Sequence, residues 1–264
     1  MFKFSSVETD NFFKYLSTLC NSNFRDDPLL EHQIKSMAAL AFSTMSKSDS
    51  LLFSLDYTIK CATIALDIVR GRVIQTGQAD AHSMRQILCA TLFCRVGILR
   101  GLFLEDKDPT FLKPNREMIT LPYTQTDSAL WQHCADRSCL YLRTKLDDVP
   151  YLEIESIAEA IQGADFTETA PPANPSHLGN ITRACQIIGL MSNLDTNRAT
   201  LKIFLSAREG GVLERFGLKT LDQFRAGYQK YFWENLFTDI TDIIPILEET
   251  DTGFQRMVGI YQQV

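Results

Sequence analysis

A nearly continuous apolar run extends from Ser83 to Gly101. Apolar residues surround the whole circumference of a helix drawn through this run, which is typical of a helix with protein on all sides. Hydrophobic residues make up 45% of the 264 positions, enough to build one sizeable core around such a helix. The run therefore predicts a helical domain with this segment at its centre.

The rest of the chain also favours helices. Leu51 to Val73 carries apolar residues at spacings of three and four, with Gly71 near its end. Convincing strands with alternating polarity are absent, so the fold class is all-α. Residues 1–50 are expected to form an N-terminal helical extension that joins the domain at 51–264 in one globular unit. Similar patterns predict helices over 129–146, 152–163, 178–192, 200–209, 221–249 and 252–263, and loops over 104–126 and 167–176.

Composition excludes several function classes. The net charge is -6 and no run of Lys or Arg stands out, so a nucleic acid partner is not expected. No window approaches the ~20 apolar residues that span a bilayer, so no membrane partner is expected either. The seven Cys contain no CxxC pair, and the N-terminus lacks the apolar core of a secretory signal. These features indicate a cytoplasmic protein with free thiols.

Several stretches follow the order and spacing of motifs in one enzyme family. From Leu51 to the C-terminus, the chain resembles the bacterial HD-domain metal-dependent phosphohydrolase-like proteins. That family shows Tyr-His-Asn-x-x-His-Thr on an early helix and His-Asp-x-Gly-Tyr-x-Arg-Gly on a central helix. Arg-Ala-Ala-Asp-x-Ile-Gly follows, and an aromatic cluster lies near the end. The corresponding stretches here are Leu52 to Thr58, Phe93 to Gly101, Pro150 to Phe166, His177 to Gly189, and Phe224 to Trp233.

The resemblance implies five metal-ligand positions, and the residues found there differ from the family pattern. The two early His fall at Phe53 and Tyr57, the His-Asp pair at Cys94 and Arg95, and the late Asp at Gln186. A guanidinium stays protonated and has no lone pair to give to a cation. A single Cys thiolate would be a soft ligand and cannot make a site for phosphoryl chemistry by itself. The sequence thus predicts an HD-like helical bundle with no metal, no cofactor and no catalytic residues.

Two interpretations of the degenerate centre remain open. If Arg95 points inward, it either pairs with a carboxylate such as Asp56 or binds an anionic ligand such as a nucleotide. Further anion contacts could come from Arg100, His133 and Arg183. His133 lies one residue further from the following Asp-Arg pair than in the family, so it is either a pocket residue or a structural one.

Cys94 also permits two interpretations. An adjacent cation can depress a thiol pKa and make the sulfur reactive. Cys94, His133 and Asp136 could then be written as a nucleophile arrangement. However, sequence neighbours on a helix point in different directions, and a buried inert Cys is common on an apolar helix.

The function expected from these observations is regulatory, ligand-binding or scaffolding, as a pseudo-phosphohydrolase in a bacterial cytoplasm. One alternative is a metal-dependent phosphohydrolase with displaced ligands drawn from His82, His133, Asp136 and His177. Another is a homodimeric protein-interaction module. The aromatic residues Tyr228, Tyr231 and Phe232 share one helical face, which serves either core packing or a dimer interface.

Overall fold

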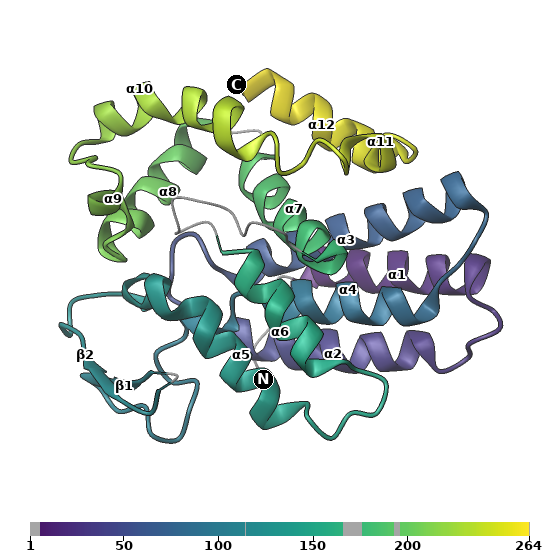
Figure 1. The fold of residues 1–264 in the computed structure, drawn as a ribbon, viewed down its shortest axis with the longest axis horizontal. Coiled ribbons are helices and arrows are strands. Elements are labelled where there is room, and N and C mark those ends of the chain that lie inside the picture. Colours follow the sequence, from purple (N-terminus) through teal and green to yellow (C-terminus); the bar gives the residue numbers. More distant parts are fainter. Residues whose placement is uncertain (1–5, 114, 166–175, 193–195, 264) are drawn as a thin grey trace.

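The computed structural model describes residues 6–113, 115–165, 176–192 and 196–263, and its helices confirm the all-α fold class (Figure 1). The Pro-rich loop predicted over 167–176 lies outside the described residues except for Ser176. The α-helices are α1 (Ser6–Asn23), α2 (Leu30–Met45), α3 (Leu55–Thr76), α4 (Ala81–Phe93), α5 (Cys134–Lys145), α6 (Ile154–Gly163), α7 (His177–Met191), α8 (Thr196–Glu209), α9 (Val212–Arg215), α10 (Leu221–Tyr231), α11 (Ile244–Leu247) and α12 (Asp251–Gln263). Two 3-10 helices, η1 (Val96–Ile98) and η2 (Asp127–His133), a π-helical turn, η3 (Phe232–Leu236), and two strands, β1 (Thr110–Leu112) and β2 (Met118–Thr120), complete the order.

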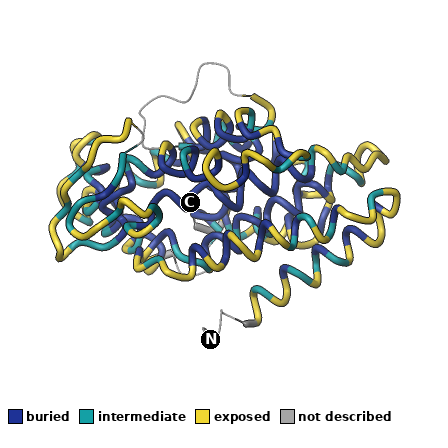
Figure 2. The backbone as a smooth tube through the Cα atoms, turned by 90° about the horizontal axis from the view of Figure 1, so that it is seen from below, coloured by how far each residue is buried: buried dark blue, intermediate teal, exposed yellow. Residues whose placement is uncertain are grey.

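Helix α4 lies at the centre of the molecule. All its residues from Met84 to Phe93 are buried, and α2, α3, α6 and α7 pack around it. Figure 2 shows this as a continuous buried zone through the middle of the fold. The predicted helix over 83–101 is therefore correct in burial but too long, because the chain leaves the helix after Phe93 and turns into η1. A Cβ at Gly97 would lie 2.0 Å from the Cys134 carbonyl oxygen, so the start of α5 packs directly on this turn.

Helix α3 begins later than the apolar pattern suggests. The Ser54 side chain accepts a hydrogen bond from the Tyr57 backbone N–H at 3.4 Å and caps the helix at Leu55. The helix continues past Gly71 and ends at Thr76, and it is capped by Gly77, which has a left-handed φ of 68°. Gly71 is needed for packing, because a Cβ there would lie 1.9 Å from the Ile246 carbonyl oxygen in α11.

Two further predictions of secondary structure are wrong. The single helix over 221–249 is divided into α10, η3 and α11, and Pro245 in the first turn of α11 lacks the N–H that a continuous helix would need. The loop over 104–126 contains the antiparallel hairpin β1–β2, in which Phe111 pairs with Ile119. The Asp106 carboxylate holds this segment by accepting the Leu112 backbone N–H at 2.8 Å and pairing with Arg137.

The N-terminal helices share the hydrophobic core of the rest of the chain. Leu16 of α1 and Ile34 of α2 belong to the same buried cluster as residues of α3, α4 and α7. The Phe12 and Phe42 rings meet edge to face at 5.3 Å between centroids. Among the described residues, no helix is both long and apolar enough to cross a membrane.

Candidate functional site

Arg95 lies just after the end of α4 and its side chain is 3% exposed. Its Nε donates a hydrogen bond to Oε1 of Gln186 in α7 at 3.2 Å. Its Nη2 donates to the Ala164 carbonyl oxygen at 3.3 Å, and Nη1 lies 3.9 Å from Oδ1 of Asp165. The guanidinium carbon also lies 5.1 Å from the centroid of the Phe53 ring. The guanidinium thus points into the protein and contacts groups from three separate segments.

Tyr57 and Phe53 complete this cluster from the start of α3. The Tyr57 hydroxyl donates to the Gln186 carbonyl oxygen at 2.9 Å and to its Oε1 at 3.1 Å. The Phe53 ring meets the Tyr57 ring edge to face at 5.5 Å. Ring contacts and hydrogen bonds therefore link Phe53, Tyr57, Arg95 and Gln186 to one another in a chain of neighbours. We call these four residues the Arg95 cluster.

Cys94 lies beside this cluster as a buried thiol. Burial raises the pKa of Cys94 to about 12, although the positive charge of Arg95 opposes the change. Burial likewise raises the pKa of Cys134 to about 12, and the Cys134 sulfur lies 3.9 Å from the Cys94 carbonyl oxygen. Both sulfurs are therefore protonated thiols at neutral pH. This favours the structural interpretation of Cys94 over a reactive nucleophile.

The charge of Arg95 is compensated by the C-terminal end of α6. Burial lowers the pKa of the Arg95 guanidinium, the negative charge of Asp165 opposes this lowering, and the net pKa lies above its ordinary value. The Ala164 carbonyl that Arg95 contacts follows the last residue of α6, where the helix dipole favours a cation. The carboxylate partner is thus Asp165 rather than Asp56, the partner suggested from the sequence.

Arg183 binds the same end of α6. Its Nη1 donates to the Asp165 carbonyl oxygen at 2.9 Å and lies 3.4 Å from the Gly163 carbonyl oxygen. Its Nε donates to the Asp239 carboxylate at 2.8 Å. Arg95 and Arg183 therefore share one structural task, which is to satisfy the last carbonyl groups of α6.

Arg100 and His133 have surroundings that argue against anion contacts. The Arg100 guanidinium lies within 4 Å of the carboxylates of Asp49, Asp108 and Asp127, which already supply negative charge. Burial lowers the pKa of His133, and the nearby charges of Lys113 and Arg137 lower it further. His133 is therefore a neutral imidazole at pH 7.

The displaced-ligand alternative requires a group of side chains able to hold a cation. Within the described ranges, no group of three or more His, Cys, Asp and Glu side chains has such an arrangement. His82 is exposed and faces Glu153 at 3.2 Å, while burial lowers the pKa of His177 at the start of α7. The donor set in this part of the chain does not fit a hydrolytic metal site.

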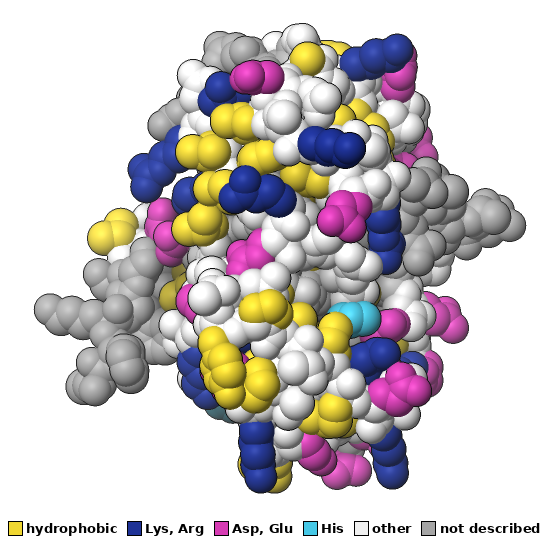
Figure 3. Space-filling model, turned by 90° about the vertical axis from the view of Figure 1, so that its left-hand side faces the viewer, with side chains coloured by type: hydrophobic (Ala, Val, Ile, Leu, Met, Phe, Trp, Pro, Cys, Tyr) yellow, Lys and Arg dark blue, Asp and Glu magenta, His cyan; other side chains and the backbone are white. Residues whose placement is uncertain are grey.

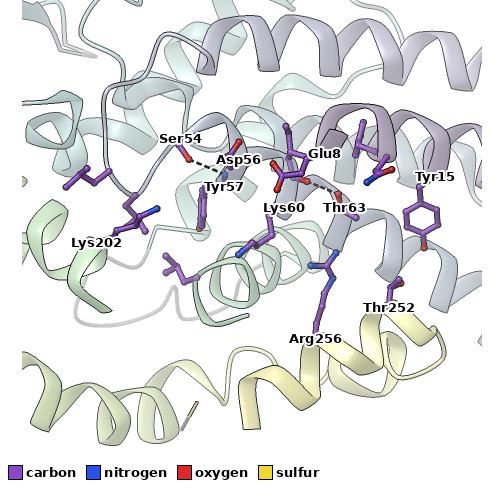
Figure 4. A pocket seen from close by; sticks show the side chains of 16 residues that line it. Glu8, Tyr15, Ser54, Asp56, Tyr57, Lys60, Thr63, Lys202, Thr252 and Arg256 are labelled. Carbon is purple, nitrogen blue, oxygen red and sulfur yellow. Dashed lines mark hydrogen bonds between the residues drawn. The ribbon is translucent and has the colours of Figure 1, made fainter. Parts of the chain in front are cut away.

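Tyr57 also lines a polar pocket of about 640 Å³ (Figure 4). Its charged residues come from four helices. The lining residues include Glu8 from α1, Asp56 and Lys60 from α3, Lys202 from α8 and Arg256 from α12. Ser54, Tyr57, Thr63 and Thr252 also reach it, so Tyr57 belongs both to the Arg95 cluster and to this pocket.

The sequence interpretation missed this polar pocket, although a signal was present. Asp56, Lys60 and Thr63 follow the spacing i, i+4, i+7, so they form one polar stripe on a mostly apolar helix. Thr252 and Arg256 repeat the i, i+4 spacing on α12. Such a stripe alone is indistinguishable from an ordinary solvent-facing surface. Only the packing of α1, α8 and α12 around it makes a pocket.

A second pocket, of about 270 Å³, is almost entirely apolar. Tyr228 and Tyr231 line it with Ile203 and Leu213, and the Tyr228 hydroxyl contacts the Met191 sulfur at 2.8 Å. Figure 3 shows hydrophobic side chains gathered on the upper half of the face where α8, α9 and α10 lie. Phe232, by contrast, is fully buried, so this part of the predicted aromatic face packs in the core.

Comparison with known proteins places the chain in one family. A family model described as Npun_R2479-like matches residues 5–264, so the chain belongs to the Npun_R2479-like family. Neither the curated proteins nor the solved structures contain a significant match. The description of the family carries no activity, and the resemblance to HD-domain phosphohydrolases stays a hypothesis.

Proposed function

We propose that this member of the Npun_R2479-like family is a metal-free, non-catalytic relative of the HD-domain phosphohydrolases. In this proposal it acts as a regulatory ligand-binding protein in a bacterial cytoplasm. The observation that carries the proposal is the position of the Arg95 guanidinium, which lies against Phe53 and Gln186. These are positions where the resemblance implies metal ligands.

Electrostatics supports the absence of metal chemistry. A hydrolytic cation needs several neutral imidazoles and carboxylates around it to activate a water molecule. Here a buried guanidinium would repel a divalent cation, and repulsion between like charges is strong in a poorly solvated interior. The nearest acid, Asp165, already faces Arg95 at 3.9 Å. The guanidinium thus supplies the positive charge that a cation would supply in a hydrolase.

The polar pocket supports a ligand-binding role. A volume of about 640 Å³ is within the range of small-molecule sites. Tyr57 lines this pocket and donates its hydroxyl to Gln186, so a bound ligand would touch a member of the Arg95 cluster. Ligand binding could therefore alter the hydrogen bond between Tyr57 and Gln186 at the centre of the fold.

A hydrolysis assay tests the proposal. The purified protein should not hydrolyse nucleotides or p-nitrophenyl phosphate above background, with or without added Mn²⁺, Mg²⁺ or Zn²⁺. Turnover that scales with protein concentration and is abolished by Asp136→Asn would instead support the displaced-ligand hydrolase. A matched substitution at an exposed acid, Glu117→Gln, controls for general effects of losing a carboxylate.

The second candidate function is that of a homodimeric protein-interaction module. Phe254, Val258 and Tyr261 are exposed at spacings of four and three along α12, and the Tyr261 ring stacks at 6.2 Å on exposed Trp233. Contiguous exposed apolar residues often mark an interface, and a twofold axis would pair this face with itself. Light scattering at micromolar concentration should then give twice the 29.9 kDa of one chain. A species with the mass of one chain would exclude this candidate.

A further inference from the structure

The polar pocket gathers three cations from three helices. Lys60 of α3, Lys202 of α8 and Arg256 of α12 all line it, and Figure 4 shows their side chains approaching one hollow. The Arg256 side chain is held in place because its Nε donates to Oδ2 of fully buried Asp67 at 3.0 Å. Asp67 also accepts hydrogen bonds from Tyr15 and Thr252, so one buried carboxylate fixes one wall of the pocket.

The three cations are close enough to influence one another. Burial lowers the pKa of Lys60, and the positive charges of Arg256 and Lys202 contribute to the lowering, against the effect of Cys61 and Glu8. Asp67 offsets part of the charge of Arg256, and Glu8 offsets part of the charge of Lys60. A dianion would add attractive interactions with all three cations, and a half-buried pocket screens such interactions less than water does. Ammonium and guanidinium groups are the side chains that proteins use to bind phosphate.

The pocket also offers acceptors for hydroxyl groups. Glu8 and Asp56 lie close together, and burial followed by repulsion from Glu8 raises the pKa of Asp56. Carboxylate oxygens accept hydrogen bonds from hydroxyl groups, and the hydroxyls of a sugar are donors of this kind. Because inorganic phosphate would fill only a small part of about 640 Å³, a larger molecule suits the space better.

We infer that this pocket binds a small phosphorylated sugar compound, of the class of nucleoside monophosphates and sugar phosphates. The phosphate lies among Lys60, Lys202 and Arg256, and the sugar hydroxyls face Glu8 and Asp56. The inference rests on the proposed ligand-binding function and gives it a site and a ligand class. The site shares Tyr57 with the Arg95 cluster, and its other residues lie outside that cluster.

Calorimetric titration of the full chain tests this assignment with four probes: AMP, ribose 5-phosphate, adenosine and inorganic phosphate. We expect the first two to bind and adenosine to bind at least about tenfold more weakly, because it lacks the charged group. Binding of inorganic phosphate as tight as that of both larger compounds would overturn the ligand class. Failure of every phosphorylated probe to bind at millimolar concentration would overturn the site.

Matched variants locate the site. Lys202→Gln and Lys60→Gln should each weaken ribose 5-phosphate binding by about tenfold, since each removes a charged contact with the phosphate. Lys14→Gln removes an exposed lysine of α1 outside the pocket lining and should leave affinity unchanged. Glu8→Gln should weaken ribose 5-phosphate binding while leaving inorganic phosphate binding intact. Equal affinities in the Lys202, Lys60 and Lys14 variants would overturn the assignment.

Two further measurements separate the loss of a phosphate contact from the loss of folded protein. Lys202→Arg keeps the charge and should retain binding, and thermal melting without ligand shows whether each variant is folded. Hydrolysis of a bound probe would contradict the proposed non-catalytic function while leaving the site in place. Absence of both binding and hydrolysis would remove the ligand assignment while leaving the argument from Arg95 untouched.

Discussion

Arg95 donates its Nε–H to Oε1 of Gln186 at 3.2 Å across the centre of the fold. The same oxygen accepts the Tyr57 hydroxyl at 3.1 Å, so two donors from different helical segments converge on one amide. These two hydrogen bonds connect the end of α4 and the start of α3 to α7. Arg95 and Gln186 therefore form a complementary donor and acceptor at two positions where the HD resemblance implies metal ligands.

Removal of the Arg95 guanidinium should destabilise the protein strongly. Arg95→Ala removes the donor of the Ala164 carbonyl, one of the two donors of Gln186 and the positive charge facing Asp165, which we expect to cost about 3–5 kcal/mol in the free energy of unfolding. Arg95→Lys keeps the charge but loses the planar guanidinium that donates from several nitrogens, which should lower the free energy of unfolding by about 1–2 kcal/mol. Urea unfolding followed by circular dichroism measures both. An Arg95→Ala variant as stable as the unsubstituted protein would show that the guanidinium has no structural role.

The Arg137–Asp106 ion pair should contribute much more to stability than the Arg143–Glu155 pair. Arg137 and Asp106 are fully buried with a contact of 2.8 Å, and Arg137 also donates to the Gly97 and Leu99 carbonyl oxygens. Arg137→Ala should therefore cost about 3–5 kcal/mol, because it leaves a buried carboxylate unpaired. Arg143→Ala serves as the control and should change little, since solvent screens that exposed pair. Equal urea midpoints for the two variants would contradict this account.

Alanine substitutions at Gly71 and Gly259 should change the stability of the protein in opposite directions. In Gly71→Ala the new Cβ would lie 1.9 Å from the Ile246 carbonyl oxygen, so α11 must move, at an expected cost of about 2 kcal/mol or more. In Gly259→Ala the Cβ would meet no described atom within 4 Å. This change should stabilise α12 by about 0.5–1 kcal/mol, because alanine restricts the unfolded chain. Thermal melting of the two variants gives the comparison, and a neutral Gly71→Ala would disprove the close packing of α11 on α3.

The sequence predicted the contacts of the Arg95 cluster better than its electrostatics. The convergence of Phe53, Tyr57, Arg95 and Gln186 was an expectation that came from the resemblance alone, and no local pattern in the sequence indicates it. The resemblance could not identify Asp165 as the partner of Arg95, since that contact depends on where α6 ends. Helical periodicity is a local property. Contacts such as Asp67 with Arg256, which join α3 to α12, depend on tertiary packing instead.

The errors in the C-terminal region have a similar cause. The apolar pattern continues through residues 221–249 without interruption, so it predicted one helix where the structure has α10, η3 and α11. Pro245 in the sequence argued against a single helix, because proline cannot donate the hydrogen bond of a helix interior.

The hairpin β1–β2 was missed because its strands have only three residues each, too few for an alternating pattern to be distinguished from a loop.

Ligand binding in the polar pocket should depend on pH with two limbs. Affinity should rise with pH as the phosphate loses its second proton near a pKa of about 6. It should fall again as Lys60 loses its proton, and burial places the pKa of Lys60 below its ordinary value. The titratable and charged groups around Lys60 are Asp56 and Cys61 of α3 itself, Glu8 from α1, Lys202 from α8 and Arg256 from α12. The bound dianion favours the protonated lysine. Titration calorimetry across this range measures both limbs.

The control for the pH dependence is Lys60→Arg. A guanidinium stays charged throughout the accessible range, so the alkaline loss of affinity should disappear while the acidic limb remains. An alkaline limb that is unchanged in Lys60→Arg would show that another group titrates in the pocket.

The metal content of the purified protein tests the central claim most directly. After dialysis against Mn²⁺, Fe²⁺, Zn²⁺ and Mg²⁺ and removal of unbound ions, elemental analysis should find no metal in stoichiometric amount, because Arg95 supplies the buried positive charge. The same measurement on Glu117→Gln, which removes an exposed carboxylate, controls for adventitious binding to the exterior. One equivalent of a divalent metal retained per chain would contradict the account.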